Sequence, residues 1–404
     1  MLNLFLPKKT NKSSNGTRAA HAEVAAVIPT YKPTKTTVEL VASLLKWYPK
    51  LQVVVVDDST PLTTENSKTI NAIKALAKKN KKLTYLRTPV NALKAGALNF
   101  GISYLQARKN RPDVIFTSDD DVEVNEQTFT IMVEQLLADR KIGAVCSLAL
   151  VKNKNKNILT RLQSLEYHSY NLTRTADNGF LKGPMVMHGM LTAFKSSVLK
   201  QINGFTQNHL IEDYDITVRM KNAGYDSKLA LNAKAWTEVP ETLEDLWKQR
   251  VRWSYGGLGV VSQYYRNVSA IFQDLMGHTL FITLSILVLL SIIVERSYLV
   301  SSTIIIAVVS IAIINFIAAF TINLATMLLY PRRDKFDWAL KTTVIPELIY
   351  CNILTMILVG SYLFFAYNRA LNPLVKRVNI FFKPYNAGLN MFSKIGYSST
   401  WGTR

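Results

Sequence analysis

Short apolar runs alternate with amphipathic segments from residue 24 to residue 117 of the chain. Each apolar run has the length of a strand, and each intervening segment places apolar residues three or four positions apart, as on one face of a helix. The predicted strands are residues 24–28, 51–56, 83–86 and 114–117, and the predicted helices are residues 34–47, 70–77 and 94–107. Strands that alternate with helices predict a mostly parallel, doubly wound α/β sheet.

Beyond residue 270 the pattern changes to three long apolar stretches, at residues 275–294, 299–320 and 344–366. A helix of about 20 residues spans the hydrocarbon core of a bilayer, so we expect two to three transmembrane helices. The third stretch contains Pro346, Glu347 and Asn352, which leaves a re-entrant or interfacial segment as the alternative for it.

These patterns divide the chain into five predicted regions. They are a basic N-terminal tail (1–22), an α/β domain (23–240), an amphipathic interfacial region (241–270), a transmembrane region (271–367) and a basic C-terminal tail (368–404). Because basic loops stay on the cytoplasmic side of a membrane, we expect an integral membrane protein of the plasma or inner membrane with a cytosolic α/β domain.

The net charge of the chain and the distribution of its basic residues indicate which kind of partner it binds. The chain of 404 residues has a formal net charge of +20. Its basic residues lie in scattered runs without interleaved aromatic residues, so we expect a lipid bilayer and no nucleic acid among its partners. The two cysteines, Cys146 and Cys351, predict neither a disulfide framework nor a zinc site.

Two acidic clusters follow predicted strands, at the edge where doubly wound sheets bind ligands. Asp57 and Asp58 can accept hydrogen bonds from a nucleoside, or they can simply cap a turn. Asp119, Asp120 and Asp121 repel one another unless a cation or water satisfies them. In an extended segment Asp119 and Asp121 would point the same way, which predicts a site for Mg²⁺ or Mn²⁺. A solvated acidic loop is the alternative.

Further candidates lie at predicted helix starts. Lys94 could pair with a diphosphate or be a surface lysine. Glu212 and Asp213 open a helix, where carboxylates suit the helix dipole without any function. The functional interpretation is a general base that removes a proton from an attacking hydroxyl.

The run QRVRW at residues 249–253 precedes the apolar stretches. On a helix Gln249, Arg252 and Trp253 share one face, because they are three and four positions apart. An amide, a guanidinium and an indole suit a sugar chain and a pyrophosphate. An interfacial helix with a snorkelling arginine is the alternative.

In this order, these motifs resemble the processive family 2 glycosyltransferases, which have a GT-A fold and include cellulose, chitin and hyaluronan synthases. The resemblance covers residues 24–260. Its motifs are Asp57/Asp58, Asp119-x-Asp121, Glu212-Asp213 and Gln249-x-x-Arg252-Trp253.

The resemblance implies a membrane-bound inverting hexosyltransferase that uses a UDP-sugar donor and a polysaccharide acceptor. It implies that Asp213, with Glu212, is catalytic and that Gln249 and Trp253 hold the acceptor. Mg²⁺ or Mn²⁺ would be held by Asp119 and Asp121. The residues implied for the nucleotide sugar are Asp57, Asp58, Lys94, Asp119, Asp120 and Arg252.

Two runs resemble the hyaluronan synthase branch, which uses UDP-GlcNAc and UDP-GlcA. One is NILTRL at residues 157–162. The other is the final run Trp401-Gly402-Thr403-Arg404, which the resemblance assigns to a gating loop over the nucleotide. The alternatives are a chitin, cellulose or other exopolysaccharide synthase, a single-sugar transferase acting on a lipid phosphate, and an inactive nucleotide-sugar-binding scaffold.

Overall fold

The structure is a computed structural model that describes residues 21–180, 182–207, 209–266, 324–378, 380 and 382–397, with six single positions between residues 306 and 321. It divides into two compact units, one comprising Met1–Gln263 with Ile357–Arg404 and the other comprising Tyr264–Met356. Apart from those single positions, the predicted spans at 275–294 and 299–320 lie outside the described residues. The terminal run from Trp401 to Arg404 also lies outside them.

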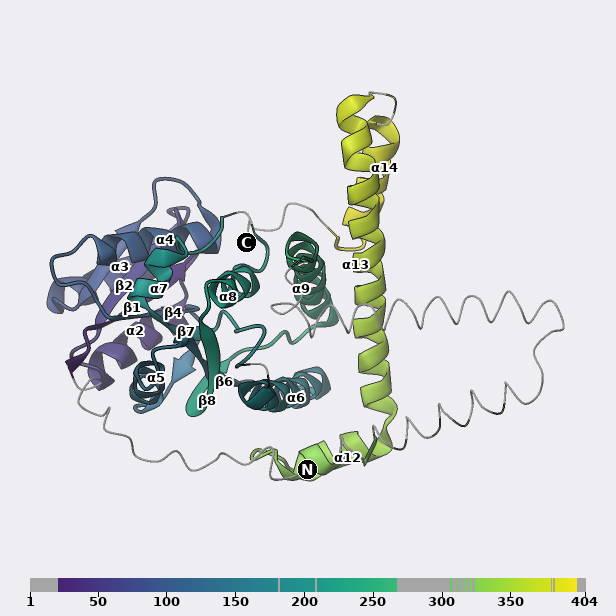
Figure 1. Ribbon diagram of the computed structural model, residues 1–404, viewed down its shortest axis with the longest axis horizontal. Coiled ribbons are helices and arrows are strands. Elements are labelled where there is room, and N and C mark those ends of the chain that lie inside the picture. The colour runs from purple at the N-terminus through teal and green to yellow at the C-terminus, as the bar shows by residue number, and fades with distance from the viewer. Residues whose placement is uncertain are drawn as a thin grey trace. The chain divides into compact units, whose positions relative to one another are not determined.

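An eight-stranded mixed sheet forms the centre of the first unit, in the order β3-β2-β1-β4-β7-β6-β8-β5 (Figure 1). The pairs β1–β2, β1–β4, β2–β3 and β6–β8 are parallel. Strands β7 and β5 run antiparallel to their neighbours. The strands are β1 Val24–Thr30, β2 Gln52–Asp57, β3 Leu83–Arg87, β4 Val114–Ser118, β5 Glu123–Val124, β6 Ile142–Val151, β7 Leu191–Lys195 and β8 Asp226–Thr237.

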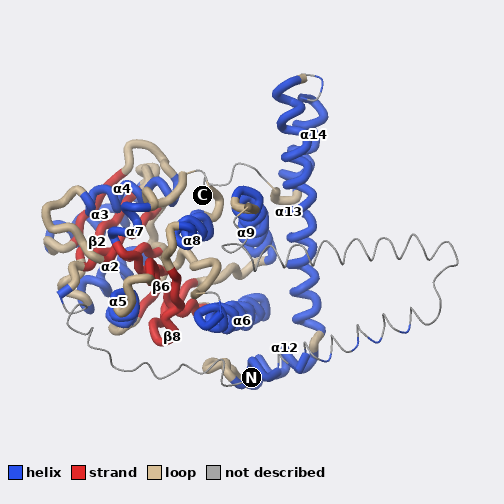
Figure 2. Tube along the Cα trace, viewed as in Figure 1, coloured by secondary structure: helices blue, strands red, loops and turns tan. Residues whose placement is uncertain are grey.

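Helices connect the strands and cover both faces of the sheet (Figure 2). Their bounds are α2 Lys35–Trp47, α3 Thr64–Lys79, α4 Leu93–Gln106, α5 Thr128–Leu137, α6 Ile158–Phe180, α7 Ser196–Gln201, α8 Glu212–Asn222 and α9 Leu243–Gln263. The predicted strands and helices between residues 24 and 117 are all present, with their ends shifted by a few residues. The predicted α/β class is therefore confirmed.

Strand β1 shows why the sheet is buried on both faces. Ala26 and Ile28 pack with α2 and α5 residues in one core, whereas Ala25 and Val27 pack with α4 and α8 residues in the other. Successive strand side chains point to opposite faces, so a continuous apolar run fills two cores. The sequence run VAAVIPT has this composition.

The antiparallel strand β7 brings together segments that are far apart in sequence. Ser118 at the end of β4 pairs with Leu191 at the start of β7. The next residue, Asp119, donates its main-chain N–H to the carbonyl of Met190 at 3.0 Å. The loop before β7 therefore lies at the ligand-binding edge of the parallel strands.

Helix α9 also contacts the C-terminal part of the same unit. The indole Nε1 of Trp247 donates a 2.8 Å hydrogen bond to the carbonyl of Ile395, just beyond α14 (Phe382–Lys394). Tyr397 is buried and donates from its hydroxyl to the carbonyl of Ile357 at 2.9 Å. Residues 395–397 are thus fixed against the helix that carries the QxxRW run.

Among the described residues, one helix segment, Ile345–Val375 within α13 (Ile345–Arg377), is long and apolar enough to cross a bilayer. It corresponds to the third predicted apolar stretch and continues through Glu347 and Asn352 without a break. Pro346 is tolerated because it lies in the first turn, where its missing N–H has no helical partner. The short helix α12 (Lys335–Thr343) precedes it in the chain.

Candidate active site

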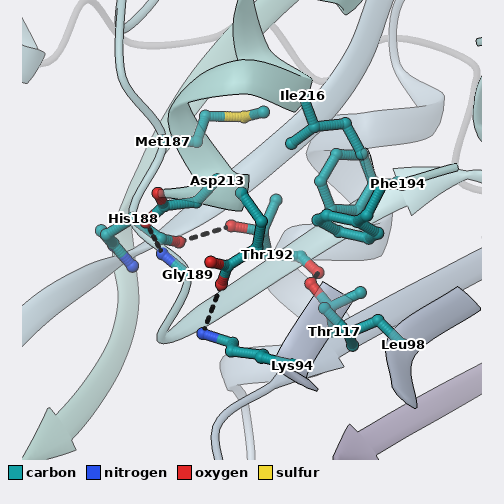
Figure 3. A pocket seen from close by; sticks show the side chains of 12 residues that line it. Lys94, Leu98, Thr117, Met187, His188, Gly189, Thr192, Phe194, Asp213 and Ile216 are labelled. Carbon is teal, nitrogen blue, oxygen red and sulfur yellow. Dashed lines mark hydrogen bonds and ion pairs between the residues drawn. The ribbon is translucent and has the colours of Figure 1, made fainter. Parts of the chain in front are cut away.

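Four of the predicted site residues form one ionic cluster at the carboxyl edge of the sheet, and Figure 3 shows two of them, Lys94 and Asp213, in the pocket there. The ammonium of Lys94, at the start of α4, lies 2.5 Å from Oδ1 of Asp119 and 2.9 Å from Oε1 of Glu212. Asp213, the next residue of α8, lines the same pocket. The cluster forms because the end of β4 and the N-termini of α4 and α8 meet here.

Asp213 is held by two main-chain donors. Gly189 donates its N–H to Oδ2 at 2.7 Å, and Tyr214 donates its own to Oδ1 at 2.8 Å. A Cβ added to Gly189 would lie 2.8 Å from Nζ of Lys94 and 3.2 Å from Oδ2 of Asp213. A residue without a side chain therefore lets the main chain approach both groups.

The environment of the cluster raises the pKa of both Asp213 and Lys94 above their ordinary values. Burial, reinforced by the adjacent carboxylate of Glu212, raises the pKa of Asp213 to about 6 even though Lys94 pulls it down. Burial works to lower the pKa of Lys94, but the surrounding carboxylates outweigh it and hold that pKa above its ordinary value. Asp213 is consequently a carboxylate at neutral pH with raised basicity, which suits a general base.

His188 lies beside Gly189 and was not predicted from the sequence. Its Nε2 is 2.7 Å from the carbonyl of Ser147, and burial lowers the pKa of the ring to about 3. The neutral ring donates from Nε2, so Nδ1 carries a lone pair. The carbonyl of His188 accepts a 3.0 Å hydrogen bond from the hydroxyl of Thr192. These contacts fix the loop that presents Gly189 to Asp213.

The three consecutive aspartates do not form the extended segment expected from the sequence. Asp120 and Asp121 occupy a turn between β4 and β5, so the expected alternation of side chains is wrong here. Asp120 accepts a 2.5 Å hydrogen bond from Thr30 at the end of β1, whereas Asp119 contacts Lys94. Asp121 is exposed on the turn. Because the chain turns here, consecutive side chains do not alternate as they do in an extended strand.

Asp57 is bonded entirely within the protein. Its Oδ2 accepts from the hydroxyl of Tyr85 and from Nη1 of Arg87, both at 2.6 Å, and its Oδ1 accepts from the N–H of Thr60 at 3.0 Å. The side chain is fully buried. These contacts join the ends of β2 and β3. The nucleotide-binding role given to Asp57 stays a prediction.

Asp58 fixes the main chain that leads into α4. Its Oδ1 accepts from the hydroxyl of Thr88 at 2.9 Å and from the N–H of Ala92 at 2.8 Å. Ala92 is the residue before α4, so this carboxylate fixes the entry to the helix that carries Lys94. Its proposed contact with a nucleoside is likewise a prediction.

The predicted metal ligands suit a cation shared with a substrate. Among the residues that the structure describes, no group of three or more His, Cys, Asp or Glu side chains is arranged to hold a metal. Mg²⁺ commonly binds through one or two carboxylates with waters and substrate phosphates supplying the other ligands. Asp119 precedes the turn and Asp121 lies on it, and both offer the carboxylate oxygens that Mg²⁺ or Mn²⁺ binds, so the chemistry of this donor set fits such a shared ion.

The QxxRW residues lie on helix α9, as the sequence predicts. Gln249, Arg252 and Trp253 are partly exposed, and Arg252 makes no ion pair with any side chain in the described ranges. Three residues beyond Trp253, the helix packs closely against the start of α8: a Cβ on Gly256 would lie 2.4 Å from Cγ1 of Ile211. The QxxRW helix is thus packed beside the residue that precedes Glu212.

Arg250, within the same run, is buried and was not predicted to contribute. Its Nη2 lies 2.6 Å from Oε2 of Glu166 on α6, and its guanidinium carbon lies 4.2 Å from the ring centroid of Trp253. A cation over an indole ring is attracted to the ring quadrupole. The pairing residue is 84 positions away, so the run itself carries no signal for this burial.

Comparison with known proteins places the chain in a broad enzyme class. Residues 21–256 match the family described as "Glycosyltransferase like family 2". A solved mannosyltransferase from Pyrobaculum calidifontis, in complex with GDP-Man and Mn²⁺, superposes with a TM-score of 0.54 over 84% of this chain and 87% of its own. At 18% identity this likeness concerns the fold alone.

Curated relatives are more similar in sequence. A poly-beta-1,6-N-acetyl-D-glucosamine synthase of Staphylococcus epidermidis is 27% identical over 257 residues, or 63% of this chain and 60% of the relative. The synthase of the same description from Staphylococcus aureus strain COL is 28% identical over 235 residues, or 58% of this chain and 54% of the relative. The match thus spans little more than half the length of these relatives.

Proposed function

This chain belongs to the family 2 glycosyltransferases and has their GT-A fold, and on that premise we propose that it extends a polysaccharide by transferring sugar units from a UDP-sugar with inversion. The observation that carries the proposal is the position of Asp213. Its carboxylate is fixed by two main-chain N–H groups, has a raised pKa, and lies in a pocket with a cation.

Asp213 acts as the general base in this mechanism. It accepts the proton of the acceptor hydroxyl as that oxygen forms its bond to the anomeric carbon of the donor sugar. The bond from that carbon to the diphosphate breaks on the opposite face, and UDP leaves. A positioned base contributes roughly 10²–10⁴-fold to such a step.

Lys94 and Asp119 bind the leaving group. The ammonium of Lys94 already lies between two carboxylates and would also attract the diphosphate. Asp119 and Asp121 would hold Mg²⁺ or Mn²⁺, which when bound neutralises the charge that develops on the departing UDP. Arg252 would add a planar donor pair to the phosphate oxygens.

Helix α9 would hold the acceptor. Trp253 presents an aromatic ring on the helix that packs against the start of α8, and Gln249 lies one turn earlier on the same helix. A sugar ring stacked on the indole would direct its terminal hydroxyl toward Asp213. Positioning of this kind can contribute several kcal/mol to lowering the barrier.

The similarity to poly-beta-1,6-N-acetyl-D-glucosamine synthases supports UDP-GlcNAc as the single donor. This changes the finer expectation from the sequence, which was a hyaluronan synthase that also uses UDP-GlcA. We propose a membrane-anchored enzyme with a cytosolic catalytic domain, which the apolar segment Ile345–Val375 supports.

The test is to incubate the purified chain with Mn²⁺ and either UDP-GlcNAc alone or UDP-GlcNAc with UDP-GlcA, and then to measure product size and linkage. A polymer formed from UDP-GlcNAc alone is the expected result. A polymer that needs both donors would identify a hyaluronan-like enzyme instead. Single-sugar products would indicate a lipid-phosphate acceptor, and UDP binding without any release of UDP from the donor would indicate a scaffold.

A further inference from the structure

Polar side chains form a continuous series of contacts along one face of α6. Glu166, Tyr170 and Arg174 are spaced four residues apart, so they lie one above another on the helix. Tyr170 donates from its hydroxyl to Oε1 of Glu166 at 2.7 Å, and the guanidinium carbon of Arg174 lies 5.8 Å from the ring centroid of Tyr170. The contacts therefore extend over two turns.

One end of this series reaches the QxxRW helix. Oε2 of Glu166 accepts from Nη2 of Arg250 at 2.6 Å, and the side chains are only 11% and 5% exposed. Arg250 in turn lies over the ring of Trp253. The indole that would receive the acceptor sugar is thereby connected to α6 through one guanidinium.

The other end reaches the loop that holds the base. Nε of Arg174 donates to the carbonyl of Val186 at 3.2 Å. Val186 is three residues before Gly189, whose N–H is bonded to Asp213. The same face of α6 thus contacts both the support of Trp253 and the support of Asp213.

Further polar contacts fix the rest of α6 to the segment before α9. Nε2 of Gln163 donates to the carbonyl of Pro240 at 2.7 Å, and Nδ2 of Asn157, the residue before α6, donates to the carbonyl of Glu241 at 2.9 Å. The two groups bind the main chain that leads into α9. Contacts from α6 and the residue before it therefore hold the main chain that precedes α9, as well as Arg250 within the QxxRW run.

From these contacts we propose that Glu166 and Arg250 are positioning residues, which set the orientation of Trp253 relative to Asp213 and so the alignment of the acceptor hydroxyl. The inference rests on the proposed function of the site. A buried ion pair adds little net stability over an apolar pair, because removing both charges from water is costly. Unlike an apolar pair, a hydrogen-bonded ion pair has a defined direction, and this direction suits the alignment of Trp253.

The experiment compares Glu166→Gln, Arg250→Gln, the double variant and Arg250→Lys in the full chain. UDP release is measured with the donor varied and with N-acetylglucosamine oligosaccharides varied as acceptors, together with product length. We expect each Gln variant to lower kcat/KM for the acceptor about tenfold while the donor KM stays within about twofold. The double variant should be no worse than the poorer single one, and Arg250→Lys should recover part of the loss.

Lys248→Gln is the matched control, because Lys248 lies on the same helix in an exposed ion pair with Glu244. It should leave both parameters unchanged. Additive effects of the two Gln variants, or equal losses of donor and acceptor affinity, would overturn the positioning role. Retained UDP binding by the variants shows that they are folded. A wild-type chain that releases no UDP from any donor would instead overturn the proposed function itself.

Discussion

The main-chain N–H of Gly189 donates a 2.7 Å hydrogen bond to Oδ2 of Asp213, and a Cβ added to Gly189 would lie 2.8 Å from Nζ of Lys94. The contact joins the loop before β7 to the first turn of α8. It fixes the direction of the carboxylate without adding a titratable group. The predicted base is therefore oriented by the backbone.

Gly189→Ala should slow transfer, because the added methyl group would displace Lys94, Asp213 or both. We expect kcat to fall by about tenfold to a hundredfold, since small misplacements of a reacting group are costly. Steady-state UDP release measures the effect. Gly259→Ala is the matched control, because a Cβ there would meet no atom within 4 Å. Equal activities of the two variants would contradict the packing argument.

Asp213→Asn should abolish polymer formation and spare UDP binding. The amide keeps the size of the side chain but cannot accept the proton, so we expect a loss of roughly 10²–10⁴-fold in kcat. Product analysis and calorimetric titration with UDP measure the two properties separately. Turnover at the wild-type rate would remove Asp213 from the role of base.

The rate should fall on the acidic side of neutrality. Burial and Glu212 raise the pKa of Asp213 to about 6, so the base is ionised above that pH and becomes protonated below it. The profile of kcat against pH should bend near pH 6. Lys94→Met removes a cation that lowers this pKa, so the bend should move to higher pH; a shift to lower pH would contradict the assignment.

A divalent cation should be required, and Asp121 should contribute to its affinity. Treatment with EDTA is expected to stop UDP release, and added Mn²⁺ should restore it. Asp121→Asn should raise the Mn²⁺ concentration for half-maximal rate about tenfold, because metal sites with few protein ligands depend on each carboxylate. An unchanged Mn²⁺ dependence would show that Asp121 is a solvated turn residue.

Trp247→Phe should loosen the C-terminal segment that follows α14. The variant loses the hydrogen bond from the indole to the carbonyl of Ile395, which is worth about 1 kcal/mol. Limited proteolysis, followed by mass analysis of the fragments, should show faster cleavage near residue 395. Protection equal to that of the wild type would mean that the packing of Tyr397 alone holds this segment in place.

The sequence predicted the fold well where local pattern decides it. Strand β1 and helix α2 follow from apolar periodicity, and the positions of Lys94, Asp119 and Glu212 follow from the rule that ligands bind at the carboxyl ends of parallel strands. The direction of β7 could not be predicted, because its own five residues do not specify which way a neighbouring strand runs.

The less predictable parts of the site depend on distant partners. Asp57 is buried because Tyr85 and Arg87 from another strand bond to it. Arg250 is buried because it pairs with Glu166, which lies 84 positions away in the chain. An arginine in an amphipathic helix is ordinarily expected on the surface. Gly189 belongs to no sequence motif. Its importance comes from the close approach of Lys94 and Asp213, which the sequence does not reveal.

The pairing of β4 with β7 also bears on the order in which the protein folds. Asp119 reaches Met190 across more than seventy residues, and Asp213 is later still in the chain. Contacts of such long sequence separation form slowly, because a large loop must close first. During synthesis the acidic turn after β4 would emerge well before the groups that complete the cluster. Under the proposed function, the ability to bind UDP would therefore be acquired late, once β7 has paired with β4 and α8 has followed.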